Sequence, residues 1–204
     1  MQATAIYLAN RGDGSRYLGA AEKAVTAARR GEQPEVVAQA LFEYARSGEE
    51  MGDEARVLAA LREIDDLLKD PTGPTLPMLL YAQAFCHWFL FDPGAAARSL
   101  ETAKDLLADG RNLTELSQVH NGYGNCKYHL CEFAAARDAY LAGLEAAQRV
   151  GDDSRASLVT GNLCSLLTFG GDYDGAVQFG LQSVRFGAQA LNQPRLWSTF
   201  TCLA

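Results

Sequence analysis

Three histidines and five cysteines are the residues of this 204-residue chain best suited to metal binding or nucleophilic catalysis. The histidines are His87, His120 and His129, and none has a metal-ligand spacing with a cysteine or a carboxylate. His129 and Cys131 are close in sequence, but residues two apart point away from each other on a helix, which disfavours a Cys–His nucleophile. Phosphate-binding glycine-rich loops follow a strand, and the sequence predicts no strand before any of its glycines. A phosphate-binding loop is therefore not expected. The sequence therefore predicts that the chain is not an enzyme and holds no metal or cofactor.

Four of the cysteines recur at a nearly constant interval. Cys86 and Cys126 are 40 residues apart, and Cys164 and Cys202 each follow after 38. This recurrence predicts small packing residues on equivalent helices. The odd total and the absence of a C-x-x-C pair argue against a disulfide framework and favour a reducing, cytoplasmic environment.

A 40-residue period also orders the small and apolar residues. Ala96, Ala136 and Ala176 each begin the same three-residue pattern. Its second residue lies four positions after the alanine, and its third residue lies seven positions after it. Fainter copies begin at Val57 and Tyr17. A fixed period in this range indicates stacked supersecondary units that each pack on their neighbours. The sequence therefore predicts one elongated domain over 1–204.

Each period divides into two helical stretches separated by a short turn. The predicted pairs are 3–10 with 16–30, 34–50 with 53–68, 76–91 with 95–107, 113–130 with 133–150, and 154–169 with 173–187. In the last pair, Gly170 or Gly171 can adopt the left-handed conformation that ends a helix, and Asp172 can cap the next one.

The charge balance and the apolar runs exclude two classes of partner. The net charge is −7, from 18 basic and 25 acidic residues, and no basic block is present, which argues against a nucleic-acid footprint. No apolar run approaches the ~18 residues of a membrane span. The first residues lack the basic region of a signal peptide. We therefore expect a cytoplasmic protein that binds neither nucleic acid nor membrane.

The motif residues of the last two predicted pairs resemble the tetratricopeptide repeat. They are Asn125, Phe133, Ala136 and Tyr140 in one pair, and Asn162, Leu163, Cys164, Gly171, Asp172, Tyr173 and Ala176 in the other. Leu100 and Gly180 replace the usual aromatic residue. The period is 40 rather than 34, as in the longer variety of bacterial transcriptional and signalling regulators.

The resemblance implies an all-α fold, a right-handed α–α solenoid of about five helix pairs plus a terminal helix. The expected units are 1–33, 34–73, 74–112, 113–152 and 153–192, with the terminal helix over 193–204.

In this family the first helix of each pair lines a concave groove. The resemblance assigns the following residues to a peptide-binding groove: Phe42, Arg46, Tyr81, Phe85, Trp88, Asn121, Asn125, Tyr128 and Ser165. Asparagine can bond both the N–H and the C=O of an extended peptide, and aromatic residues can receive apolar side chains. The alternative for the aromatic residues of 81–89 is that at least half of them belong to the core.

The end of the chain is apolar where a solenoid cap is usually polar. Its apolar residues are Leu196, Trp197, Phe200 and Leu203. This composition predicts an interface, either with another copy of the chain or with the continuation of a longer chain.

The sequence thus predicts a non-catalytic scaffold that binds a protein or peptide segment in its groove, as the sensor or interaction module of a bacterial regulator. One alternative is an oligomerisation module that assembles through the solenoid ends. Another is a receptor domain for a peptide or a small molecule.

Overall fold

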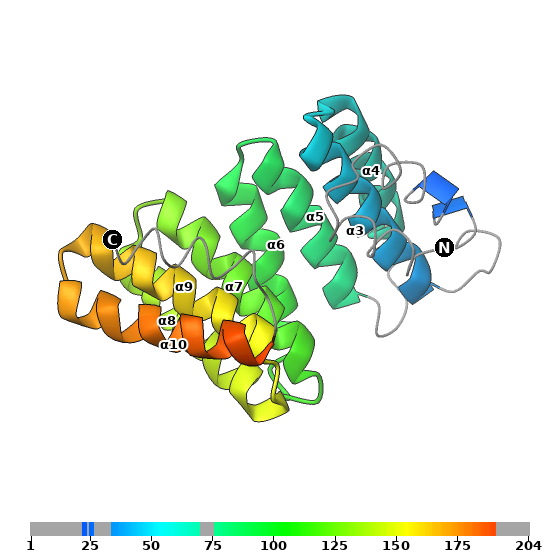
Figure 1. Cartoon of the computed structure of the whole chain (residues 1–204). Helices are drawn as coiled ribbons and strands as arrows, with labels where there is room; N and C mark the ends of the chain where they lie inside the picture. The colour runs from blue at the N-terminus through cyan, green and yellow to red at the C-terminus, as the bar shows by residue number, and fades with distance from the viewer. Residues whose placement is uncertain (1–21, 24, 27–33, 70–75, 191–204) are drawn as a thin grey trace. The chain divides into compact units, whose positions relative to one another are not determined.

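The computed structural model of the chain describes residues 22–23, 25–26, 34–69 and 76–190. The helices within these ranges are α3 (Pro34–Met51), α4 (Glu54–Leu67), α5 (Leu76–Phe89), α6 (Pro93–Leu106), α7 (Leu113–His129), α8 (Phe133–Val150), α9 (Asp153–Gly170) and α10 (Tyr173–Gln189) (Figure 1). The all-α class is confirmed, and every one of these helix ends lies within two residues of its predicted position. The first predicted pair, apart from four helical residues, and the terminal helix lie outside the described residues. None of the described helices is long and apolar enough to span a membrane.

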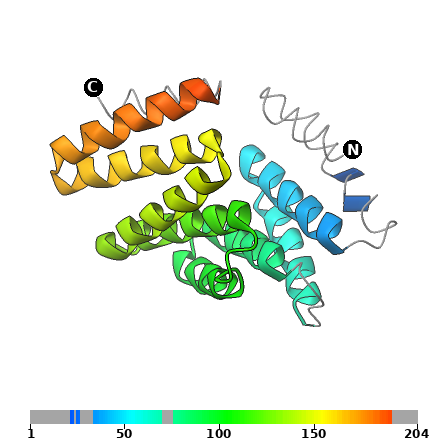
Figure 2. The same ribbon diagram turned by 90° about the horizontal axis from the view of Figure 1, so that it is seen from below.

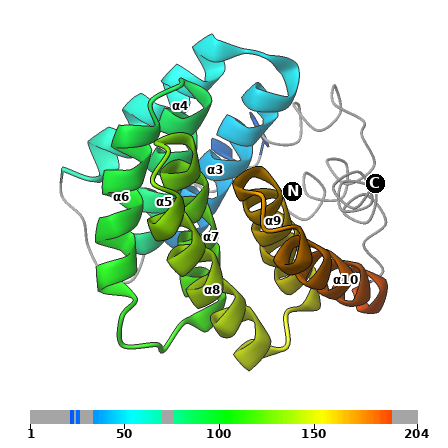
Figure 3. The ribbon, with the colours of Figure 1, turned by 90° about the vertical axis from the view of Figure 1, so that its left-hand side faces the viewer.

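The chain divides into two compact units, with the boundary between Ala103 and Lys104 inside α6. In the first unit, α3 packs on α4 and α5, and α4 also packs on α5. In the second unit, α7 packs on α8, α8 on α9, and α9 on α10, while α7 also contacts α9. Figures 2 and 3 show α9 and α10 side by side along their length.

Each unit has its own apolar core, built from residues that recur every three or four positions. In the first unit, Ala38, Leu41 and Ala45 of α3 are fully buried, which is the spacing of one helix face. They pack with residues of α4 and α5 that include Val57, Ala60, Ile64, Ala82 and Cys86. The core of the second unit consists of Ala136, Tyr140, Leu144 and Ala147 of α8 with Ala156, Val159, Leu163 and Leu166 of α9.

The prediction that the recurring cysteines are packing residues is confirmed for three of them. Cys86, Cys126 and Cys164 are buried and reduced. Burial raises the pKa of Cys86 and of Cys126 to about 12, so both remain protonated. Cys131 is an exposed free thiol, and Cys202 lies outside the described residues.

The turn inside each helix pair contains one residue in the left-handed conformation. These residues are Gly52, Phe91, Cys131 and Gly171, with φ of 65°, 60°, 60° and 79°. Gly171 thus ends α9 as predicted. Asp172 caps α10 by accepting the Gly175 N–H at 3.0 Å, which is also as predicted. The non-glycine residues Phe91 and Cys131 occupy the same place in the period as Gly171.

Buried serines fix the register of the two helix pairs in the second unit. The Ser117 hydroxyl of α7 donates to the carbonyl of Gly143 on α8 at 2.7 Å. The Ser157 hydroxyl of α9 donates to the carbonyl of Ser183 on α10 at 2.9 Å, and Ser183 donates back at 2.8 Å. Both pairs join residues 26 apart, so the two helix hairpins share one register.

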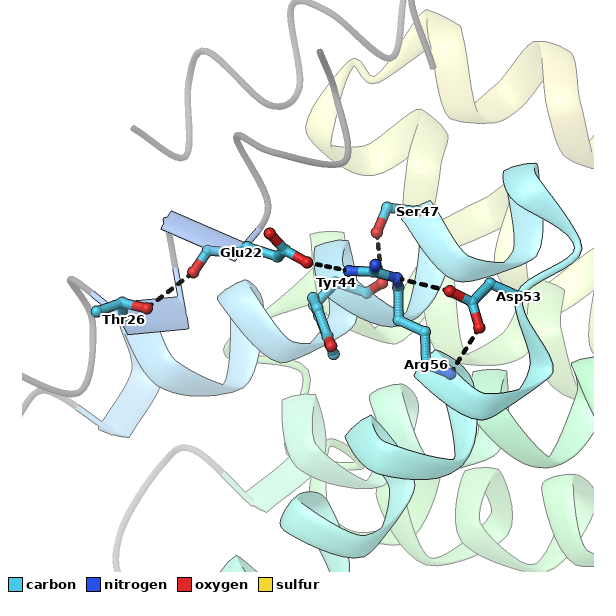
Figure 4. Close-up of polar contacts among 6 residues, drawn as sticks. All are labelled: Glu22, Thr26, Tyr44, Ser47, Asp53 and Arg56. Atoms are coloured by element: carbon cyan, nitrogen blue, oxygen red, sulfur yellow. Dashed lines mark hydrogen bonds and ion pairs between the residues drawn. The ribbon is translucent and has the colours of Figure 1, made fainter. Parts of the chain in front are cut away.

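A mostly buried arginine joins α3, α4 and residue 22 in the first unit (Figure 4). The side chain of Arg56 is 13% exposed, with Nη1 2.8 Å from Glu22 and Nε 3.2 Å from Asp53. The guanidinium carbon lies 4.9 Å from the centroid of the Tyr44 ring on α3. Asp53 also caps α4 by accepting the Arg56 N–H at 3.1 Å. These contacts hold the start of α4 against α3.

Candidate functional site

Three asparagine side chains from α7 and α9 meet in the second unit. Nδ2 of Asn162 on α9 donates to Oδ1 of Asn121 at 2.8 Å and to Oδ1 of Asn125 at 3.3 Å, both on α7. Asn121 is 8% exposed, and the other two are half-buried. We call these three residues the amide cluster. It joins the first helices of two successive pairs, which are the helices that the sequence assigns to the binding face.

A buried tyrosine on α8 fixes the amide cluster from inside the unit. Tyr140 is 3% exposed, and its hydroxyl donates to Oδ1 of Asn125 at 2.8 Å. Burial raises the pKa of Tyr140, so the phenol stays protonated and available as a donor. Its ring passes Gly124, where an added Cβ would lie 2.5 Å from Cε1 of the ring. The lack of a side chain at Gly124 therefore allows Tyr140 to reach Asn125.

Three polar atoms of the amide cluster have no hydrogen-bond partner among the described residues. Oδ1 of Asn121 and Oδ1 of Asn125 accept hydrogen bonds, and Nδ2 of Asn162 donates them. Within the described part of the chain, Nδ2 of Asn121, Nδ2 of Asn125 and Oδ1 of Asn162 make no hydrogen bond. The cluster thus has two free amide donors and one free amide acceptor.

The other predicted groove residues of the second unit lie on the same two helices. Ser165 is half-buried on α9, three residues after Asn162, and its hydroxyl donates to the Gly161 carbonyl at 3.1 Å. Tyr128 lies on α7, three residues after Asn125, and its ring contacts the rings of neighbouring aromatic residues. The binding role of both stays a prediction.

Three of the predicted groove residues of the first unit, Phe42, Tyr81 and Phe85, pack on one another and on the core. Phe42 is 8% exposed, and its ring centroid lies 5.4 Å from that of Tyr81 and 5.1 Å from that of Phe85. Tyr81, Phe85 and Trp88 are half-buried. Arg46 forms an ion pair with the buried Glu43 at 3.2 Å. A binding role for these residues stays a prediction, and the structure brings Phe42, Tyr81 and Phe85 together.

The prediction of site residues omits Asn162, which completes the amide cluster, and Tyr140, which bonds to Asn125 from the buried side. The sequence contains a signal for Tyr140. Position 124 is a glycine, and its missing side chain leaves room for a large ring from the next helix. The predicted end-interface residues Leu196, Trp197, Phe200 and Leu203 lie outside the described residues.

Two lysines near α7 contact one aromatic ring, and one histidine of α7 has a buried ring nitrogen. Nζ of Lys104 and Nζ of Lys127 lie 4.9 Å and 5.2 Å from the centroid of the Tyr123 ring. Nδ1 of His120 is buried without a hydrogen-bond partner among the described residues, and burial, with a smaller effect from Lys104, lowers its pKa. No group of three or more His, Cys, Asp or Glu residues in the described ranges is placed to hold a metal ion. The amide cluster is therefore the candidate site on these two helices.

Two solved structures are similar to this chain. BtubC (BKLC) from P. vanneervenii is 20% identical with a TM-score of 0.75, and the match covers 93% of this chain and 81% of BtubC. A Rap protein complexed with competence and sporulation factor is 15% identical with a TM-score of 0.81, and the match covers 96% of this chain and 55% of Rap. The chain therefore spans about half the length of the Rap protein.

No family model matches the chain, and no curated protein matches its sequence. The helix pairs are compatible with repeats of the tetratricopeptide type. At 15–20% identity the structural likeness shows the fold alone, and this fold is the α–α solenoid that the sequence predicts.

Proposed function

We propose that this chain is a non-catalytic module that binds an extended peptide or protein segment on the amide cluster. The observation that carries the proposal is the arrangement of three asparagines that bond to one another and still keep two donors and one acceptor free. An extended peptide backbone offers N–H and C=O groups of the complementary kinds.

The internal bonds of the amide cluster favour binding because they fix the side chains before a ligand arrives. Asn162 holds Asn121 and Asn125, and Tyr140 holds Asn125 from the buried side. Ordering flexible side chains on binding opposes association by about 0.5–1.5 kcal/mol each, and prior order reduces that term. Each new hydrogen bond contributes only about 0.5–1.5 kcal/mol net. The cluster would therefore fix the path of a peptide, while apolar contacts supply most of the affinity.

The comparison with the Rap protein supports a binding role, since that structure is a complex with competence and sporulation factor. A place as the sensor or interaction module of a regulator is part of the same proposal. It follows from the resemblance of the repeat to those of bacterial regulators.

The proposal can be tested with isosteric substitutions that leave the amide cluster intact. In Asn121→Asp and Asn125→Asp the accepting Oδ1 remains for the bonds from Asn162 and Tyr140, while the free Nδ2 donor is replaced by an accepting oxygen of an anionic carboxylate. Random heptapeptides displayed on phage are selected on the immobilised chain, and the affinity of a selected peptide is measured by fluorescence polarisation. We expect each variant to bind that peptide roughly two- to tenfold more weakly.

The matched control is Gln148→Glu, which makes the same chemical change at an exposed amide of α8 outside the cluster. It is expected to leave peptide affinity unchanged. The proposal is wrong if no heptapeptide is selected, or if the selected peptides bind both aspartate variants as tightly as the parent chain.

A second candidate function is self-association, which the outer face of α10 favours. Val177 and Leu181 lie one helical turn apart, and they are 48% and 58% exposed. Residues four apart share one face of a helix, so the two form an apolar surface.

A further inference from the structure

Three aromatic rings from three different helices pack against one another at one edge of the second unit. Tyr128 comes from the end of α7, Phe133 from the start of α8 and Phe169 from the end of α9. The ring centroids are 5.8 Å apart for Tyr128 and Phe133, 6.0 Å for Tyr128 and Phe169, and 5.3 Å for Phe133 and Phe169. We call these residues the aromatic triad.

The aromatic triad is exposed although its rings are apolar. Phe169 is 67% exposed and Phe133 is 37% exposed, while Tyr128 is half-buried. Single exposed apolar residues are common on protein surfaces. Three rings in mutual contact from three helices form a preassembled apolar surface instead, which is the kind of surface that interaction sites use.

The aromatic triad continues the surface of the amide cluster along the same two helices. Tyr128 follows Asn121 by seven residues on α7, and Phe169 follows Asn162 by seven residues on α9. Residues seven apart lie on one helix face, separated by about 10 Å at a rise of about 1.5 Å per residue. An extended peptide rises about 3.3 Å per residue and covers that distance with about three residues.

We infer that the aromatic triad receives one large apolar side chain of the extended peptide that the amide cluster holds. That side chain belongs to a residue about three positions from the one whose backbone bonds to the asparagines. Aromatic and aliphatic side chains that fill such surfaces are the usual anchors of peptide recognition. The inference rests on the proposed function and adds a sequence requirement, since the asparagines alone recognise only the backbone.

The test combines one substitution in the chain with one substitution in the peptide. Heptapeptides that depend on the amide cluster are scanned with alanine, and each product is measured by fluorescence polarisation against the parent chain and Phe169→Ser. We expect the parent chain to lose about tenfold in affinity when one leucine-, isoleucine- or phenylalanine-like position becomes alanine. Phe169→Ser is expected to weaken the original peptide by the same factor and to leave the affinity for the alanine peptide unchanged.

The matched control is Tyr173→Ser, because Tyr173 is 68% exposed on the same turn and Phe169 is 67% exposed. It is expected to change neither affinity. Thermal denaturation of Phe169→Ser is expected to stay close to that of the parent chain, because most of the ring is already in water.

Each of the following results overturns the inference. If peptides bind through the amide cluster without an apolar requirement, or bind Phe169→Ser as tightly as the parent, the triad does not contact the ligand and the proposed function still stands. If no peptide depends on the cluster, the proposed function fails and this inference fails with it. If Phe169→Ser abolishes self-association in light scattering and leaves peptide affinity unchanged, a second copy of the chain covers the triad.

Discussion

At the scale of single residues, the contact between Gly124 and Tyr140 links packing to the candidate site. The ring fills the space that a side chain at 124 would occupy, and its hydroxyl reaches Asn125. The equivalent positions 40 residues earlier hold Ala84 and Leu100. The period therefore preserves the two facing positions, while the sizes of their occupants differ between units.

Replacement of Gly124 by alanine tests this complementarity. The new Cβ would lie 2.5 Å from Cε1 of Tyr140, so the ring or a helix must shift. We expect Gly124→Ala to lower the free energy of unfolding by about 1–3 kcal/mol in urea denaturation. The double variant with Tyr140→Leu copies the pair Ala84 and Leu100 and is expected to recover much of this loss.

The double variant also separates fold from function, because leucine cannot donate to Asn125. It is expected to be stable and to bind selected peptides more weakly than the parent. Equal stability of Gly124→Ala and the parent chain would contradict the packing argument.

At the scale of helices and turns, much of the architecture can be read from the sequence. The 40-residue period together with glycine and aspartate signals places the described helix ends within two residues. Local residue type does not identify the left-handed positions at Phe91 and Cys131, since neither residue favours that conformation. Only their places in the period, equivalent to Gly171, identify them.

The turn between α5 and α6 should be more stable with glycine at its left-handed position. A non-glycine residue in this conformation costs roughly 1–2 kcal/mol, and Phe91 is 93% exposed, so its removal forfeits little apolar burial. We expect Phe91→Gly to raise the free energy of unfolding by about 1 kcal/mol in urea denaturation. Gly171→Ala serves as the reciprocal control and is expected to lower it by a similar amount. A destabilised Phe91→Gly would show that the ring has contacts that outweigh the strain.

At the scale of the whole molecule, the 40-residue period predicts that polar side chains gather on the first helices of the pairs. It does not predict every residue that takes part. It places Asn121 and Asn125 on one face of α7, and the structure agrees. Asn162 is missed because it lies one position away from the period equivalent of Asn121. The packing of α9 on α7 brings its side chain between those asparagines, and a repeat pattern contains no information on that rotation.

The outer face of α10 leads to a prediction about assembly. Leu181 is 58% exposed, and Leu181→Glu places a negative charge on this apolar face. If the chain self-associates through this face, light scattering of the parent at high concentration shows an oligomer and the variant shows a monomer. Val150→Glu, at a 43% exposed apolar position on α8, is the control and is expected to retain the oligomer. A parent chain that is monomeric at high concentration would rule out self-association.

The exposed thiol in the turn between α7 and α8 makes the molecule suitable for site-specific labelling. Thiol reagents attack the thiolate, and the buried Cys86 and Cys126, with pKa values of about 12, supply almost none at neutral pH. Cys131 is exposed and lies two residues before Phe133 of the aromatic triad. With Cys202 replaced by serine, a maleimide fluorophore on Cys131 would make the chain an optical sensor, whose emission reports the arrival of a ligand at that edge of the second unit.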